Sequence, residues 1–104
     1  MPEFVKAAKV SDLKEDMGVL AIVNNVEVAL FLVEGSVYAI ANKCAHKGGP
    51  LADGHLLGMD IICPWHGMKY DIRTGKAAPD AWNKTFSVAS FETKIEGEDV
   101  LIKM

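Results

Sequence analysis

Two short Cys–His pairs constrain the fold of this chain more than any other feature of its sequence. Cys44 is followed two residues later by His46, and Cys63 three residues later by His66, with sixteen residues between His46 and Cys63. Each pair offers one thiolate and one imidazole, both of which are good ligands for transition metals. A disulfide between the two cysteines would leave both histidines without a role. The pattern therefore predicts a metal centre held between two loops.

The size and charge of the chain limit the functions open to it. With 104 residues, half of them apolar, the chain can form one compact domain but has no room for a second catalytic domain. A net charge of −3 without a run of Lys or Arg predicts no nucleic-acid site and no patch for anionic membranes. Glu3, Lys6 and Lys9 interrupt the N-terminal region, which predicts neither a signal peptide nor a membrane span. We therefore expect a cytoplasmic protein whose two cysteines stay reduced.

Short strand-like runs separated by turn residues predict an all-β fold. One short helical segment is expected at Ser11–Met17, with Ser11 as its cap. The turn signals, at spacings typical of hairpins in a small sandwich or barrel, are Asn24-Asn25, Glu34-Gly35, Thr74-Gly75 and Glu96-Gly97. The β-rich runs are Phe4–Val10, Val19–Asn24, Val26–Val33, Val37–Ile40, Asp60–Cys63, Lys69–Ile72, Phe86–Ile95 and Val100–Lys103.

The composition changes in the middle of the chain. Both cysteines, all three histidines and most of the glycines fall between Ala41 and Lys76, with more regular strand patterns on both sides. Neither flank alone carries enough strands for a closed structure, so the two flanks are expected to pair with each other. We predict a single domain, residues 1–104, with a base of antiparallel sheets from residues 1–41 and 76–104. The metal-binding lobe, residues 42–75, is inserted between these two parts of the base.

The two predicted loops resemble one known family, motif by motif. Residues 44–51 read CAHKGGPL, residues 63–71 read CPWHGMKYD, and Thr74-Gly75 follows. This is similar to the C-x-H and C-P-x-H-G signature of the Rieske family, and in particular to the small ferredoxin components of bacterial aromatic-ring oxygenases. The resemblance implies a Rieske-like fold and one 2Fe-2S cluster, with two cysteines on one iron and two histidines on the other. The implied ligands are Cys44, His46, Cys63 and His66.

Residues next to the implied ligands indicate which branch of the family the chain resembles. Quinol-oxidising respiratory members carry an extra cysteine in each loop, and these cysteines form a disulfide; here Gly49 and Trp65 stand at those places. The resemblance is therefore to the soluble ferredoxin branch. Pro64 stiffens the second loop directly after its cysteine, and Pro79 falls where the family has a proline-containing third loop over the cluster.

Two further positions bear on the reduction potential that the resemblance implies. Respiratory members have a serine whose hydroxyl bonds a bridging sulfide, and Met68 occupies its place in this sequence. Losing such a hydrogen bond favours the low end of the Rieske range. Tyr70 keeps the phenol that bonds a cysteine sulfur in such proteins. The alternative is that Tyr70 merely packs and Met68 faces solvent.

The resemblance implies an electron-transfer protein, not an enzyme. Such a protein passes single electrons from a flavin-containing reductase to a terminal oxygenase, with the imidazoles of His46 and His66 at the surface. Two other classes stay open: the small Rieske-like subunit of a nitrite reductase-type complex, and a structural zinc module. Zinc motifs usually pair cysteine with cysteine and histidine with histidine, which disfavours zinc. His55 has no cysteine beside it and is predicted to be an exposed turn residue instead of a ligand.

Overall fold

The described part of the chain is built from short strands. The computed structural model describes residues 3–43, 50–64, 67–77 and 87–103. Within these ranges the only helices are the 3-10 turns η1 (Val10–Asp12) and η2 (Leu51–Asp53), and none is long and apolar enough to cross a membrane. The strands are β1 (Phe4–Lys9), β2 (Gly18–Val23), β3 (Val26–Val33), β4 (Ser36–Ala41), β5 (His55–Leu57), β6 (Asp60–Ile62), β7 (Lys69–Asp71), β8 (Ser90–Phe91), β9 (Thr93–Glu96) and β10 (Asp99–Lys103).

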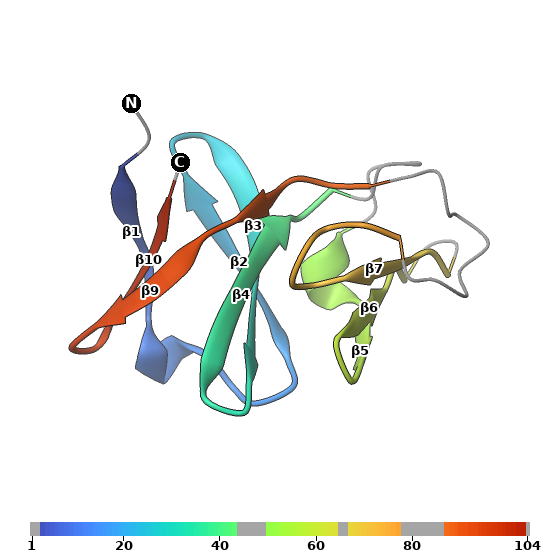
Figure 1. Ribbon diagram of the computed structural model, residues 1–104, viewed down its shortest axis with the longest axis horizontal. Helices are drawn as coiled ribbons and strands as arrows, with labels where there is room; N and C mark the ends of the chain where they lie inside the picture. Colours follow the sequence, from blue (N-terminus) through green and yellow to red (C-terminus); the bar gives the residue numbers. More distant parts are fainter. Residues whose placement is uncertain (1–2, 44–49, 65–66, 78–86, 104) are drawn as a thin grey trace.

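These strands form three antiparallel sheets, which confirms the predicted all-β class. The strand orders are β1-β10-β9, β2-β3-β4-β8 and β5-β6-β7. In Figure 1 the first two sheets lie side by side, and β5-β6-β7 lies at the opposite end of the molecule from both chain termini. The third sheet uses only residues 55–71, whereas each of the other two combines strands from both halves of the chain.

The central strand β3 is covered on both faces of its sheet, and each face has its own hydrophobic cluster. Val28 and Leu30 of β3 pack with Val100 and Ile102 of β10 in one cluster. Their neighbours Ala29 and Phe31 point to the other face, where the second cluster includes residues of the β5-β6-β7 sheet. A strand buried on both faces has a continuous apolar sequence, which explains the VALFLV run of β3. The central sheet therefore joins the third sheet to the rest of the molecule.

The predicted turn residues adopt the conformations that tight hairpins need. Between β2 and β3, Asn24 and Asn25 both have positive φ, of 51° and 66°. Between β3 and β4, Glu34 and Gly35 do the same, with φ of 52° and 80°. Positive φ at both central residues matches the right-handed twist of the strands that the turn joins. These hairpins were predictable because their geometry depends on the turn residues themselves.

Two of the sequence-based boundaries are wrong, the first for a local reason and the second for a tertiary one. The helical turn begins after Lys9, whose backbone N–H donates to Asp12 Oδ2 at 3.1 Å, so Ser11 lies inside the turn and does not cap it. The described part of the run Phe86–Ile95 is two strands: β8 pairs with β4, and β9 pairs with β10. The chain crosses from one sheet to another at Glu92, which a strand pattern alone does not reveal.

Gly75 is expected to tolerate alanine much less well than Gly97 does. Both glycines have positive φ, of 78° and 61°, so alanine costs about 1 to 2 kcal/mol of backbone strain at either position. At Gly75 an added Cβ would lie 2.1 Å from the Val88 carbonyl oxygen, whereas at Gly97 it would meet nothing within 4 Å. We expect Gly75→Ala to cost roughly 2 kcal/mol more than Gly97→Ala in urea unfolding. Equal losses of unfolding free energy would contradict the close approach to Val88.

Candidate metal centre

One of the predicted ligands, Cys63, lies within the described residues. It follows β6 directly, its side chain is 2% exposed, and it packs in the cluster that also contains Leu51, Ile61 and Met68. It forms no disulfide with another described residue. A buried thiol at the end of a strand suits a thiolate ligand, because its position is fixed by the core on one side and by the loop on the other.

The other predicted ligands and several neighbours lie outside the described residues. These are Cys44, His46, His66, Gly49, Trp65 and Pro79. Among the described residues no three His, Cys, Asp or Glu side chains gather as a metal site, as expected when a single member of the predicted set is included. The ligand set as a whole stays a prediction. The segments that flank the two loops are described, and their pairing and packing can be compared with that prediction.

The residues on either side of the first loop are paired with each other. Lys43 and Pro50 form an antiparallel bridge, so residues 44–49 are closed at their base. The Leu51 N–H donates to the Asn42 carbonyl at 2.7 Å and continues this pairing one residue further. The described residues on either side of the segment that carries Cys44 and His46 are therefore paired with each other.

The second loop is closed in the same way by the β6–β7 hairpin. The Cys63 N–H donates to the Met68 carbonyl at 2.7 Å, and the Gly67 N–H donates to the Cys63 carbonyl at 3.1 Å. Gly67 has a φ of 71°, a conformation that glycine adopts without strain. Cys63 and Met68 are thus held next to each other where β6 and β7 meet the second loop.

The two loop bases share one hydrophobic cluster. Leu51 and Ala52, which follow the first loop, pack in the same cluster as Cys63 and Met68 of the second loop. Two chain segments that start and end at one packed base can present their predicted ligands to a common site. The buried thiol and the paired loop bases therefore fit a cluster held between the loops.

A third segment is tied to this base as well. Lys76 and Ser87 form an antiparallel bridge, and Tyr70 pairs with Ala77, so the chain between residues 77 and 87 also starts and ends beside the second loop. The Val88 N–H donates to the Gly75 carbonyl at 2.7 Å. Pro79 belongs to this segment but lies outside the described residues, so its place over the cluster stays a prediction.

Met68 and Tyr70 interact directly in the core below the second loop. Both side chains are 0% exposed, and the Tyr70 hydroxyl donates to Met68 Sδ at 3.4 Å. The alternative in which Met68 faces solvent is therefore wrong. The sequence did not predict this contact, because the resemblance assigns the Tyr70 hydroxyl to a cysteine sulfur and gives methionine no role.

Asp71 and Arg73 hold the turn that follows Tyr70. Arg73 Nη2 and Nε donate to the two carboxylate oxygens of Asp71 at 2.7 and 3.0 Å, and the Arg73 N–H donates to Oδ1 at 2.8 Å. The side-chain hydrogen bond from Arg73 lowers the pKa of Asp71. A lowered pKa means that this pair stabilises the fold above the ordinary carboxyl range and is lost as pH falls through the lowered value.

His55 is exposed, as predicted, but it begins strand β5 and is not a turn residue. The sequence missed β5 because His55–Leu57 is short and pairs with β6 only across Gly58-Met59.

Asn42 is a buried polar residue beside the first loop that the sequence did not single out. It is 2% exposed, lies two residues before Cys44, and uses both its backbone and its amide group in hydrogen bonds to Glu27, Leu51 and Ala52. The signal available in the sequence was a polar residue at the end of an apolar strand run, just before a predicted ligand.

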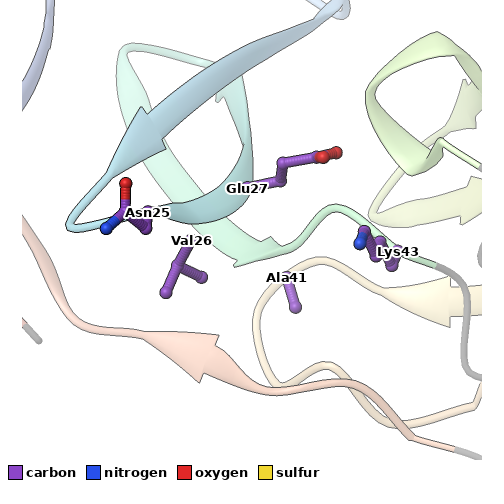
Figure 2. Close-up of a pocket in the computed structure, with 5 residues that line it drawn as sticks. All are labelled: Asn25, Val26, Glu27, Ala41 and Lys43. Atoms are coloured by element: carbon purple, nitrogen blue, oxygen red, sulfur yellow. The ribbon is translucent and has the colours of Figure 1, made fainter.

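A pocket of about 270 Å³ opens beside this residue. Figure 2 shows its lining side chains near the start of β3 and the end of β4, where the chain leaves for the first loop. They are Asn25, Val26, Glu27, Ala41 and Lys43, and none is a predicted ligand.

Known proteins that are similar to this chain in sequence and in structure include ferredoxins of dioxygenase systems. The chain is 38% identical over 101 residues to the ferredoxin component of the naphthalene 1,2-dioxygenase/salicylate 5-hydroxylase systems of Ralstonia sp., covering 97% of this chain and 95% of that protein. It is similar to the ferredoxin of carbazole 1,9a-dioxygenase from Nocardioides aromaticivorans IC177, with a TM-score of 0.88, 29% identity and 95% of each chain covered. A solved complex of reduced oxygenase and oxidized ferredoxin in carbazole 1,9a-dioxygenase contains a chain with a TM-score of 0.83 and 26% identity, covering 95% of this chain and 91% of that chain.

The family model for the Rieske [2Fe-2S] domain matches residues 3–92, which include both loops and the strands that hold them. The resemblance to Rieske ferredoxins is confirmed, and with it the cofactor of one 2Fe-2S cluster. The chain belongs to the Rieske [2Fe-2S] family.

Proposed function

We propose that this protein carries single electrons from a flavin-containing reductase to a terminal oxygenase. The observation that carries the proposal is the match to a dioxygenase ferredoxin component over 97% of this chain and 95% of that protein. A similar ferredoxin is found in a complex with its oxygenase, which supports an oxygenase as the acceptor. The reductase is proposed as the electron donor because the relatives are ferredoxin components of multi-component dioxygenase systems. The cytoplasm is part of this proposal, because free thiol ligands are kept reduced there.

We infer that Cys44 and Cys63 bind one iron and that His46 and His66 bind the other. The buried position of Cys63 and the closed bases of both loops support this assignment. The cluster supplies a one-electron couple whose potential depends on ligand charge and on hydrogen bonds to sulfur. The chain's own residues hold the cluster, exclude water from its buried side and set those hydrogen bonds.

We propose that the protein is a single domain with a base from residues 1–41 and 76–104 and a cluster-binding lobe from residues 42–75. The separate β5-β6-β7 sheet and its position in Figure 1, away from the termini, support this division. The residues expected to surround the cluster are Tyr70, Gly49, Pro64, Trp65 and Pro79.

The proposal is tested by spectroscopy and by electron transfer. The purified protein should show broad visible bands that bleach with dithionite. The reductase component of a naphthalene dioxygenase system with NADH should bleach the same bands. A colourless protein with stoichiometric zinc would overturn the cluster, and a coloured protein that no such reductase reduces would overturn the electron-carrier role.

Tyr70→Phe is expected to lower the reduction potential, and Met68→Leu to raise it. The Tyr70 hydroxyl stabilises the reduced, more negative cluster if it reaches a cluster sulfur, whereas Met68 Sδ attracts that hydroxyl away from it. A hydrogen bond of roughly 1 to 2 kcal/mol corresponds to about 40 to 80 mV for one electron. Leucine keeps the buried volume of Met68 and removes only the acceptor. Protein-film voltammetry at one pH measures both shifts, and shifts of the same sign would contradict the shared hydroxyl.

A further inference from the structure

Asn42 differs from the other polar residues that the structure describes. Within the described ranges it is the one Asn, Gln, Ser, Thr or charged residue in the buried class, at 2% exposure. Burying an amide is costly unless its hydrogen bonds are made, so such a residue calls for a physical reason. Its position, two residues before Cys44, places it at the base of the first metal-binding loop.

The hydrogen bonds of Asn42 connect three parts of the chain. Its backbone N–H donates to the Glu27 carbonyl at 3.0 Å, which ties it to β3. Its backbone carbonyl accepts from Leu51 N–H at 2.7 Å, and its side-chain Oδ1 accepts from Ala52 N–H at 2.8 Å. Its Nδ2 donates to Glu27 Oε1 at 3.1 Å. Asn42 thus connects the residue before the first loop to the residues after that loop and to strand β3.

The side chain at this position must both accept and donate. Aspartate could accept from Ala52 N–H, but it would place a second carboxylate against Glu27 and lose the Nδ2–H donor. Leucine, of similar size, would leave the buried Ala52 N–H without its acceptor. Glu27 is also one of the residues that line the pocket in Figure 2, together with Lys43. The pair Asn42–Glu27 is therefore specific in its chemistry.

We propose that Asn42, oriented by Glu27, is a positioning residue that sets the placement of the first ligand loop and so of Cys44 and His46. The inference rests on the proposed cluster and ligand set. Because one loop supplies a ligand to each iron, a shift of its base changes the bonds to both irons. The consequence is a change in the electronic structure and retention of the cluster, beyond any loss of fold stability.

The test compares four variants of the cluster-containing protein. Asn42→Asp and Asn42→Leu are expected to release the cluster roughly tenfold faster than wild type, measured as the half-life of the visible bands at a fixed temperature. Their reduced forms should show shifted g values in electron paramagnetic resonance. The double variant Asn42→Asp with Glu27→Gln restores a donor and an acceptor with the roles exchanged, and it should return to within about threefold of wild type. Glu27→Gln alone keeps an acceptor for Nδ2 and should resemble wild type.

Ile102→Ala is the matched control, because Ile102 is 0% exposed and packs in the other cluster, away from the loops. It should lower the unfolding free energy without shifting the g values. If both Asn42 variants keep wild-type g values and lose the cluster no faster than Ile102→Ala, the positioning role is overturned. If Asn42→Asp does not fold, the double variant decides the question. A double variant that folds and retains the cluster supports the positioning role of the Asn42–Glu27 pair, and one that does not overturns it. Absence of visible bands in the wild type would instead overturn the proposed function.

Discussion

Cys63→Ser is expected to abolish stable incorporation of the 2Fe-2S cluster, and Cys44→Ser to do the same. The physical reason is that, in the proposed ligand set, the two thiolates supply the soft, anionic bonds to one iron, which a serine hydroxyl replaces poorly. Serine is close to cysteine in size, so the packing around position 63 is retained and the effect is confined to the ligand. Iron and sulfide content and the visible spectrum of the purified variants measure the loss.

Met68→Leu is the control for the Cys63 variant, because Met68 is a buried neighbour in the same cluster of side chains. It changes the core beside the loop without removing a ligand, so it should keep full cluster occupancy. Far-ultraviolet circular dichroism should show that the Cys63→Ser protein keeps its strands. A fully occupied cluster with an unchanged paramagnetic spectrum in either serine variant would remove that cysteine from the ligand set.

His46→Cys or His66→Cys is expected to lower the reduction potential by roughly 100 mV where the cluster still assembles. A neutral imidazole is exchanged for an anionic thiolate, and the added negative charge favours the oxidised state. The estimate follows from the gap of about 250 mV between the lowest Rieske centres and plant-type ferredoxins with four cysteine ligands, divided over two histidines. Voltammetry of each variant at one pH and salt concentration gives the shift.

The chain contains a matched control for this experiment in its third histidine. His55 is exposed at the start of β5 and is not a predicted ligand, so His55→Cys should leave the potential unchanged. If His66→Cys behaves like His55→Cys, His66 is not bound to iron. The same comparison decides the role of His46.

The family, its cofactor and the hairpins were predictable because their signals are local. The spacing of the Cys–His pairs is the signal that predicted the Rieske family and its 2Fe-2S cluster. Asn24-Asn25 and Glu34-Gly35 adopt positive φ because of their own backbone preferences and the twist of the strands beside them. For the same reason the run Val26–Val33 was predicted with the bounds that strand β3 has.

Features that depend on distant partners were not predictable in this way. The run that ends at Ile95 divides into β8 and β9 because its two halves meet different sheets. β5 exists only through its pairing with β6. Neither event leaves a clear pattern in a few consecutive residues, because the hydrogen-bond partner of a strand is chosen by the whole fold.

The sequence by itself determined the family resemblance, the hairpin turns and the all-β class, since motif spacing, backbone φ and strand patterning are properties of residues and their chain neighbours. Only the tertiary structure decided that Met68 is buried against the Tyr70 hydroxyl and that Asn42 joins Glu27 to Ala52. Glu27 and Ala52 lie 15 and 10 residues from Asn42 along the chain and meet it only after β3, β4 and the first loop have packed. A buried amide finds its partners through that packing, because burial removes water as the alternative partner.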